Sequence, residues 1–379
     1  MTLNTILLFS ILMIFSSCNG QNNSSASNST GNEQDPIPIV IGTKGDTVKE
    51  LGNNIMLVFQ DKKNNYWFGS WLDGAYRYDG KTILHFTTKS GLCHNRIDEI
   101  KEDKSGNIYF NTSGGISKFD GQSFTTLSIT SNSNNEWKLE PDDLWFRCGW
   151  DSGLVYRYDG KFLHRLTFPD TKLGNEFMES HPPSKYPNMK ASPYSVYSIY
   201  KDTKGNVWFG TAVLGACRYD GKSVDWISEV DVTELHEGPS NGVRSIIEDK
   251  DGYFWFNTWY RYNIYGNNQG KTVFKYKREK GIGSLDGKKD GDLHEYMSIA
   301  KDNNNELWIA TYRTGVWRYD PSAELRTGSK NITHYPVKNG FKDITIFSIY
   351  KDNNGDLWLG THETGAYKFN GKTFERFKP

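Results

Sequence analysis

An aspartate recurs six residues before a tryptophan or a tyrosine along most of the chain, and this spacing is an internal repeat. The pairs are Asp61/Trp67, Asp103/Tyr109, Asp202/Trp208, Asp249/Trp255, Asp302/Trp308 and Asp352/Trp358. The phrase Arg-Tyr-Asp-Gly, or a close variant, follows at a nearly constant distance, as at residues 77–80 and 218–221. Another copy keeps Trp145 and this phrase without the aspartate, so the sequence holds seven units. Regular periods of this kind are typical of folds built by repetition.

The unit at residues 196–228 is the clearest copy and predicts four short antiparallel strands, which we name A to D. Each segment is rich in β-branched and aromatic residues and is bounded by turn residues. Asp202 is expected to hold the A–B turn through its side chain, with Gly205 at positive φ. Asp220 and Gly221 suit a tight hairpin between strands C and D.

The inner strand of each unit carries a valine or isoleucine three positions before the aspartate, often preceded by a serine. We interpret both as structural, because sheets arranged radially bury each face against a neighbour. The predicted fold is all-β, a seven-bladed β-propeller of four-stranded antiparallel blades over residues 37–379. The last blade is expected to pack on the first without a swapped strand, and residues 37–50 can add an outer strand. No helical periodicity follows the leader, which disfavours a helical solenoid.

The leader, an apolar run at residues 6–15 followed by Ser16, Ser17 and Cys18, resembles a bacterial lipoprotein signal, although no lysine or arginine precedes it. It predicts a signal peptide at residues 1–17, lipid attachment at Cys18 and a flexible tether at residues 18–36. The expected location is the bacterial outer membrane, on its periplasmic or cell-surface side. An ordinary secretory signal, with Cys18 incidental, is the alternative.

Charge and cysteine content exclude several classes of partner and cofactor. Lysine plus arginine and aspartate plus glutamate both number 45, and no basic stripe appears, so nucleic acid is not an expected partner. Cys93, Cys148 and Cys217 lack zinc-site spacing, so no metal is predicted, and no cofactor motif is present. Cys148 and Cys217 fall in adjacent blades, and whether they pair is left open.

The two faces of the predicted ring differ in sequence. The A–B and C–D turns are mostly uniform aspartate and glycine, whereas the B–C and D–A loops vary in length and carry aromatic and charged residues. Function tends to lie on such variable loops of a rigid scaffold, so the B–C/D–A face is the predicted ligand site. The candidate ligand-binding residues are Trp71, Asp73, Trp150, Asp151, Trp259, Tyr260, Arg261, Tyr312, Arg313, His362 and Glu363.

Flat aromatic rings beside directional hydrogen-bonding groups suit a sugar or another flat polar ligand. The alternative is that the rings cap blades and the charges are solvated. No motif of a known catalytic class is present. His362, Tyr312 and Arg313 could serve as base, acid and carboxylate clamp in an elimination on a uronic acid, but only three common residues support this.

The pattern SIYKDxxGxxWFGTxxxGAxRYDGK over residues 53–379 is similar to the two-component regulator propeller repeat. The resemblance implies a propeller of the kind found in the extracytoplasmic part of hybrid sensor kinases that respond to glycan fragments. It supplies no catalytic residues. The sequence contains no kinase segment, so we expect a sensing role to need a separate signalling or transport partner.

These observations predict a membrane-anchored, extracytoplasmic propeller that binds a glycan or a protein partner and is accessory to polysaccharide sensing or use. Two alternatives stay open. One is a carbohydrate-active enzyme, a polysaccharide lyase, on the same scaffold, and the other is a structural or assembly lipoprotein.

Overall fold

The computed structural model describes residues 44–130, 135–149, 153–182, 184–187, 192–229, 232–233, 242–265, 274–283, 285, 296–321 and 331–379. The expected signal peptide and tether, with Cys18, lie outside the described residues, as do the candidate site residues Trp150 and Asp151.

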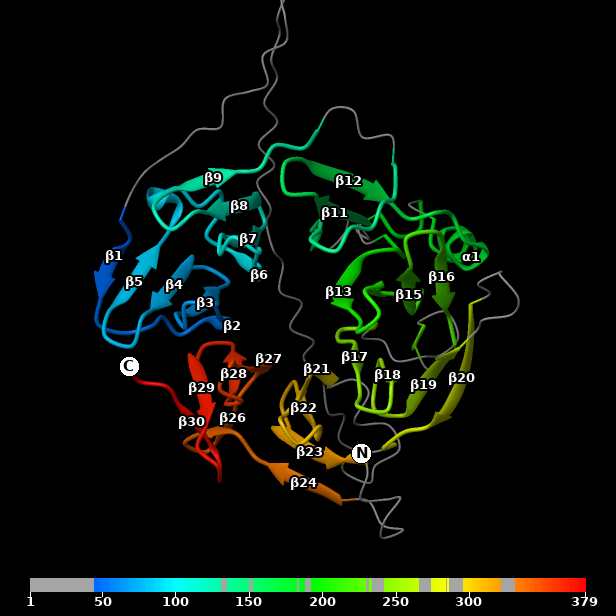
Figure 1. Ribbon diagram of the computed structural model, residues 1–379. Helices are drawn as coiled ribbons and strands as arrows, with labels where there is room; N and C mark the ends of the chain where they lie inside the picture. Colours follow the sequence, from blue (N-terminus) through cyan, green and yellow to red (C-terminus); the bar gives the residue numbers. More distant parts are fainter. Residues whose placement is uncertain are drawn as a thin grey trace, which may run out of the picture. The chain divides into compact units, whose positions relative to one another are not determined.

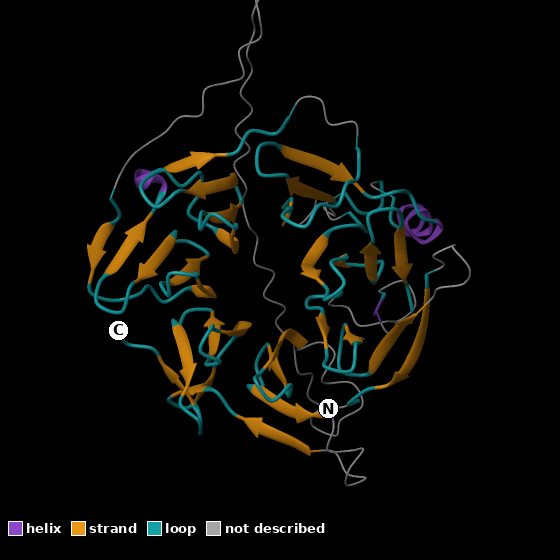
Figure 2. Cartoon of the chain, in the orientation of Figure 1, coloured by secondary structure: helices purple, strands orange, loops and turns teal. Residues whose placement is uncertain are grey.

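Seven antiparallel sheets of the described residues form the blades of a ring (Figures 1 and 2). Blade 1 holds β1 (Asp46–Val48), β2 (Ile55–Gln60), β3 (Tyr66–Ser70), β4 (Ala75–Tyr78) and β5 (Ile83–Phe86). Blade 2 holds β6 (Ile97–Glu102), β7 (Ile108–Thr112), β8 (Gly115–Phe119) and β9 (Phe124–Thr126), and blade 3 holds β10 (Leu144–Arg147), β11 (Leu154–Tyr158) and β12 (Leu163–Thr167). Blade 4 holds β13 (Val196–Lys201), β14 (Val207–Thr211), β15 (Ala216–Tyr219) and β16 (Val224–Ile227).

The remaining blades repeat the same order of four strands. Blade 5 holds β17 (Ile247–Glu248), β18 (Tyr253–Trp255), β19 (Tyr260–Tyr265) and β20 (Lys275–Lys280). Blade 6 holds β21 (Tyr296–Lys301), β22 (Leu307–Thr311), β23 (Val316–Asp320) and β24 (Asn331–Tyr335), and blade 7 holds β27 (Ile346–Lys351), β28 (Leu357–Thr361), β29 (Ala366–Phe369) and β30 (Phe374–Arg376). The predicted seven-bladed propeller is therefore confirmed.

Two blades depart from the predicted four strands. In blade 1, β1 pairs antiparallel with β5, so residues 46–48 supply the extra outer strand that the sequence allowed. Blade 3 has only three strands among the described residues, because no inner strand A precedes β10. Before this blade, at its outer strand β12, Ile129 bridges Leu163 in parallel and Thr130 N donates to Leu163 O at 3.0 Å.

The repeat aspartate organises the turn between strands A and B. In six blades its carboxylate accepts a hydrogen bond, at 2.8–2.9 Å, from the indole or phenol six residues later. In blade 4 the carboxylate also accepts main-chain N–H groups from Lys204 and Asn206. Gly205 and Gly221 have φ angles of 86° and 87°, which confirms the predicted positive-φ turns.

Inner strands of neighbouring blades are joined through small residues. Ser198 Oγ donates to Val243 O at 2.9 Å, and Ser348 Oγ donates to Met56 O at 2.6 Å. The glycine two positions after the repeat tryptophan allows this approach, because a Cβ at Gly210 would lie 2.2 Å from Val243 O. The serines are thus structural, as the sequence indicated.

The ring closes by packing and hydrogen bonds between blades 7 and 1, which lie side by side as the red and blue ends of the colour scale (Figure 1). Tyr66 Oη donates to Asp352 Oδ2 at 2.8 Å, and the ring of Phe377 packs against both Phe68 and Trp358. No strand is exchanged between these two blades in the described chain, as expected.

The long connections add three small elements. The 3₁₀ helix η1 (Thr88–Ser90) follows blade 1, the helix α1 (Lys172–Ser180) follows blade 3, and the hairpin β25 (Lys338–Asn339) and β26 (Lys342–Asp343) precedes blade 7. The sequence did not predict α1, which begins where Thr171 Oγ1 accepts a bond from Gly174 N at 3.0 Å. None of the described helices has the length and apolar content needed to cross a membrane. No disulfide joins Cys148 to Cys217 among the described residues.

Candidate functional site

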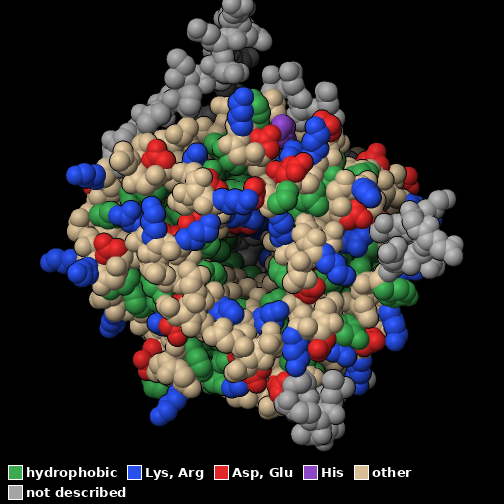
Figure 3. All heavy atoms as spheres, viewed as in Figure 1, with side chains coloured by type: hydrophobic (Ala, Val, Ile, Leu, Met, Phe, Trp, Pro, Cys, Tyr) green, Lys and Arg blue, Asp and Glu red, His purple; other side chains and the backbone are tan. Residues whose placement is uncertain are grey.

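A cavity of about 190 Å³ lies on the axis of the ring and receives residues from every blade. Its lining residues sit near the beginning of the inner strands, where the D–A connections enter, so it opens toward the B–C/D–A face. They are Met56, Leu57, Trp71, Ile97, Asp98, Arg147, Tyr197, Arg244, Met297, Ser298, Phe347 and Ser348. Figure 3 shows one face of the ring, hollowed at its centre, with lysine and arginine side chains gathered around the hollow.

Arg147 lies in β10, the first strand of blade 3 among the described residues. It stands two residues after Trp145, at the position that glycine fills in blades 1, 4 and 7. Its guanidinium donates to Asp98 O in blade 2 at 2.6 Å and to Tyr197 O in blade 4 at 3.0 Å. One side chain therefore joins the inner strands of the two neighbouring blades and faces the axial cavity.

Two further arginines surround the same region. The Arg96 Nε donates to Asp98 Oδ1 at 3.0 Å, and its guanidinium lies 4.7 Å from the centre of the Trp71 ring. The Arg244 guanidinium lies 4.6 Å from the centre of the Tyr197 ring. The described charged residues of the cavity wall are two arginines, Arg147 and Arg244, and one aspartate, Asp98.

Aromatic rings from blades 1, 6 and 7 form one side of the cavity mouth, around Phe347. The Phe347 ring lies 5.4 Å from Trp71, 5.7 Å from Tyr312 and 6.1 Å from His362, measured between ring centres. Arg313 lies 5.2 Å from the Tyr312 ring centre and is exposed. The structure thus brings together four of the residues selected from the sequence, although they come from three blades. We call Trp71, Tyr312, Phe347 and His362 the aromatic cluster.

Two acidic candidates lie beside this cluster. Glu363 is exposed, and its Oε1 lies 3.4 Å from His362 Nδ1. Asp73 lies next to the phenol of Tyr76, where burial first and the charge of Asp73 second raise the pKa of that phenol to about 12. Asp73 O also contacts His85 Nε2.

The blade 5 candidates are placed differently from the sequence expectation of a loop. Tyr260 and Arg261 belong to β19, because the B–C hairpin closes earlier in this blade: Trp255 pairs with Arg261, whereas Trp208 of blade 4 pairs with Arg218. Arg261 pairs opposite Trp255 across the sheet, contacts Glu279 at 3.4 Å and lies over the ring of Tyr253. It therefore takes the position that the repeat cation has in other blades. Trp259 is half-buried, and its indole N–H has no hydrogen-bond partner among the described residues.

Of the lining residues, the sequence analysis selected Trp71 for the site, and the arginines and further aromatic residues that it missed are Arg147, Tyr197, Arg244 and Phe347. For Arg147 a signal was present, since an arginine replaces glycine in a repeat that has also lost its aspartate. The other three precede or begin inner strands, where the repeat pattern tolerates many residue types and gives no signal.

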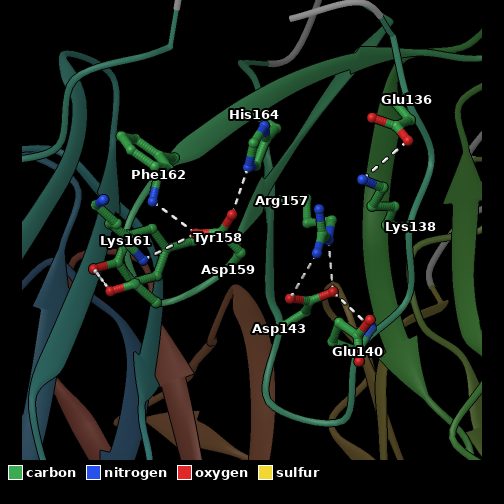
Figure 4. Close-up of polar contacts among 11 residues, drawn as sticks. Glu136, Lys138, Glu140, Asp143, Arg157, Tyr158, Asp159, Lys161, Phe162 and His164 are labelled. Carbon is green, nitrogen blue, oxygen red and sulfur yellow. Dashed lines mark hydrogen bonds and ion pairs between the residues drawn. The ribbon is translucent and has the colours of Figure 1, made fainter.

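Blade 3 contains a buried ion pair and a C–D turn held by an aspartate (Figure 4). Arg157 makes a two-pronged contact with Asp143, at 2.6 and 3.2 Å, and both side chains are buried. Asp159 accepts main-chain N–H groups of Lys161 and Phe162 in the next turn and contacts His164. These pairs lie within blade 3, and Arg147 is the residue of this blade that lines the axial cavity.

A larger open groove of about 850 Å³ runs along the A–B and C–D turns of blades 6 and 7. Two of its cations already bind carboxylates, Arg318 to Glu306 and Lys368 to Asp356. The axial cavity is the candidate ligand site, because every blade contributes residues to its wall.

The fold and this site define the chain as a seven-bladed β-propeller with an axial cavity. Three of its segments, residues 191–212, 237–260 and 340–363, match the model of the two component regulator propeller. The chain thus carries the repeats of this family, which confirms the resemblance seen in the sequence.

One curated relative is Histidine kinase P4 of Formosa agariphila, which is 26% identical over 239 residues. The match covers 59% of this chain but 16% of the kinase, so the chain spans a small part of that relative.

Solved structures show the same architecture. The extracellular domain of a protein described as a hybrid two-component system from B. thetaiotaomicron has a TM-score of 0.52 and 16% identity, over 87% of this chain and 41% of that one. A catalytically inactive virginiamycin B lyase from Staphylococcus aureus has a TM-score of 0.56 and 13% identity, over 84% of this chain and 97% of that one. At these identities the likeness concerns the fold alone. The chain therefore shares the propeller fold with these proteins.

Proposed function

We propose that this protein is an extracytoplasmic binding propeller whose ligand, a glycan or a similar polar ligand with flat faces, sits at the mouth of the axial cavity. The observation that carries the proposal is the aromatic cluster, in which rings from three blades surround Phe347 next to a cavity lined by all seven. Concave sites with aromatic walls and a few placed polar groups are the usual form of small-ligand sites.

The proposal includes the location that the leader favours. Acylation of Cys18 would hold the propeller at the outer membrane, and the tether at residues 18–36 would let the ring stand away from the lipid. A bound ligand would then be passed on or reported through a separate signalling or transport partner.

Binding to a glycan array, followed by affinity measurements on the strongest ligand, tests the proposal. Trp71→Ala removes one ring of the cluster and should weaken binding by roughly tenfold or more, because aromatic anchors dominate such contacts. Lys222→Ala and Lys372→Ala, in turns of the opposite face, are the controls and should bind as the wild type does. Equal affinity in all variants would remove this face as the site.

A polysaccharide lyase is the second candidate, favoured by one observation: Tyr312 and His362 contact the same ring of Phe347, with Arg313 beside Tyr312. In an elimination, His362 would take the proton next to the carboxylate of a uronic acid. Tyr312 would protonate the departing oxygen, and Arg313 would hold the carboxylate.

Absorbance of unsaturated products from acidic polysaccharides tests the lyase directly. Product formation that His362→Ala and Tyr312→Phe abolish would establish the enzyme, whereas binding without product would favour the binding propeller. A protein that shows neither binding nor cleavage would leave the structural or assembly lipoprotein as its role.

A further inference from the structure

The axial cavity is too small to enclose a whole ligand of the proposed kind. Its volume is about 190 Å³, whereas pockets that bury most of a small ligand usually measure about 300–1,000 Å³. The cavity has the volume of roughly six water molecules at about 30 Å³ each. It therefore has room for one sugar residue or a group of similar size, and the rest of a longer ligand has to lie outside it.

The wall of the cavity gives it one entrance. Its lining residues stand near the beginning of the inner strands, as do Leu57 in β2, Ile97 in β6 and Phe347 in β27. A separate open cavity of about 400 Å³ lies at the other ends of these strands, with Phe59 and Tyr350 in its wall, and the two cavities share no described lining residue. A linear chain that enters from the B–C/D–A face therefore stops inside the ring and does not thread through it.

Aromatic rings stand where the part of the ligand outside the cavity would lie. Trp71 and Phe347 line the cavity and also belong to the aromatic cluster, and their ring centres are 5.4 Å apart. A chain whose last residue enters the cavity would thus bring its next residue against the cluster.

A serine of the wall offers a free hydrogen-bonding group to the residue that enters. In blades 4 and 7, Ser198 Oγ donates to Val243 O and Ser348 Oγ donates to Met56 O, so both hydroxyls join neighbouring blades. Ser298 holds the same repeat position in blade 6, is half-buried and lines the cavity, but its hydroxyl has no hydrogen-bond partner among the described residues. A polar group in a cavity is favourable only when water or a ligand bonds to it, so this hydroxyl is available to a ligand.

We propose that the axial cavity recognises a chain end: the terminal residue of an oligosaccharide enters it and bonds to Ser298 Oγ, while the next residue packs on the aromatic cluster. The inference rests on the proposed binding function and narrows its ligand to chain ends. An internal residue of a polymer continues in two directions, and both continuations would have to leave through the one entrance of a cavity that holds a single residue.

The test uses short linear oligosaccharides and the parent polymers of cellulose, xylan and polygalacturonate. At equal mass concentration, binding should fall as the chains lengthen, because each chain carries one end of the kind that enters. Two modified forms of the oligosaccharide that binds best, one reduced at its reducing end and one carrying an acetal at its nonreducing end, then identify that end. One of the two forms should lose binding, because its altered end no longer fits the cavity.

Two serine variants test the contact inside the cavity. Ser298→Ala should weaken binding roughly fivefold, because one hydrogen bond to the ligand is lost. It should unfold at the same urea concentration as the wild type, because the hydroxyl bonds to no described protein group. Ser198→Ala is the matched control, since its hydroxyl joins two blades and does not line the cavity. This variant should be less stable than the wild type and bind with unchanged affinity.

Each alternative outcome is distinct. Binding that increases with chain length and tolerates both modified ends would overturn the recognition of a chain end and leave the binding function in place. Equal affinity of Ser298→Ala and the wild type would overturn the role of Ser298. Absence of binding by every oligosaccharide and polymer would overturn both this inference and the proposed function.

Discussion

The indole N–H of Trp208 donates a hydrogen bond to Asp202 Oδ2 at 2.9 Å, and both side chains are buried. The same carboxylate accepts the main-chain N–H groups of Lys204 and Asn206 and the side-chain amide of Asn206. One aspartate therefore holds the A–B turn and orients the largest ring of the blade. This explains physically why the two residue types recur together.

Asp202→Ala should lower the free energy of unfolding by about 3 kcal/mol, because the buried indole and the turn lose a charged acceptor at once. Urea unfolding followed by tryptophan fluorescence measures the loss. Asp79→Ala is the comparison, since Asp79 holds two main-chain N–H groups in an exposed C–D turn and should cost clearly less. An equal loss in both variants would contradict a special role for the buried aspartate.

Trp145 offers the reciprocal experiment, because its repeat has no aspartate and its indole N–H has no partner among the described residues. Trp145→Phe and Trp208→Phe remove similar volume, but only Trp208→Phe leaves a buried carboxylate without its indole donor. We expect Trp145→Phe to be less destabilising by about 1–2 kcal/mol in urea unfolding. If Trp145→Phe lowers the free energy of unfolding at least as much as Trp208→Phe, the hydrogen-bond explanation of the repeat is refuted.

The repeat was predictable from sequence because its bonds are local. Asp202 contacts groups two to six residues away, and Asp220 holds a turn of the same kind. The turns and strands of each unit are therefore determined by residues within that unit. Residue types with fixed spacing then reveal the number of blades. The inter-blade serines were recognised because they stand at a constant place in strand A.

The candidate site was only partly predictable, because its contacts join distant parts of the chain. Arg147 donates to Asp98, 49 positions away in the sequence, and to Tyr197, 50 positions away. Bonds between such distant residues cannot be predicted from the spacing of the repeat. The missing aspartate before Trp145 was visible, but it did not show that blade 3 has only three strands among the described residues. Likewise the B–C hairpin of blade 5 closes earlier than in other blades, which places Arg261 in a strand where the sequence pattern suggested a loop.

Acid should destabilise the protein over a definite pH range, and Asp159 should contribute to this. Burial raises the pKa of its carboxyl, but bonds from Phe162 N, His164 and Lys161 N outweigh burial and lower the pKa to about 2. A folded-state pKa below the unfolded value of about 4 stabilises the fold above pH 4, and this contribution is lost as the pH falls toward 2. Asp159→Asn should therefore flatten the fall in unfolding free energy between about pH 4 and pH 2, measured by urea unfolding at each pH. A pH dependence identical to the wild type would exclude this carboxyl as a contributor.

Ring closure depends on the close approach of blade 7 to blade 1, and Gly360 is the residue that permits it. A Cβ at Gly360 would lie 2.0 Å from Met56 O, at the place where Ser348 Oγ also donates to that oxygen. Gly360→Ala must therefore push β28 from β2, and we expect a loss of about 3 kcal/mol, with partly opened rings that associate through their exposed edges.

Urea unfolding and size-exclusion chromatography together measure this effect. Ala310 is the matched control, because it stands at the equivalent position of blade 6 and is buried with its Cβ already accommodated. Ala310→Gly should cost only about 1 kcal/mol, mainly in backbone entropy, and stay monomeric. If Gly360→Ala unfolds at the same urea concentration as the wild type and elutes as a monomer, the contact between blades 7 and 1 has room for a methyl group. The close contact of Gly360 with Met56 would then not be what holds the ring closed.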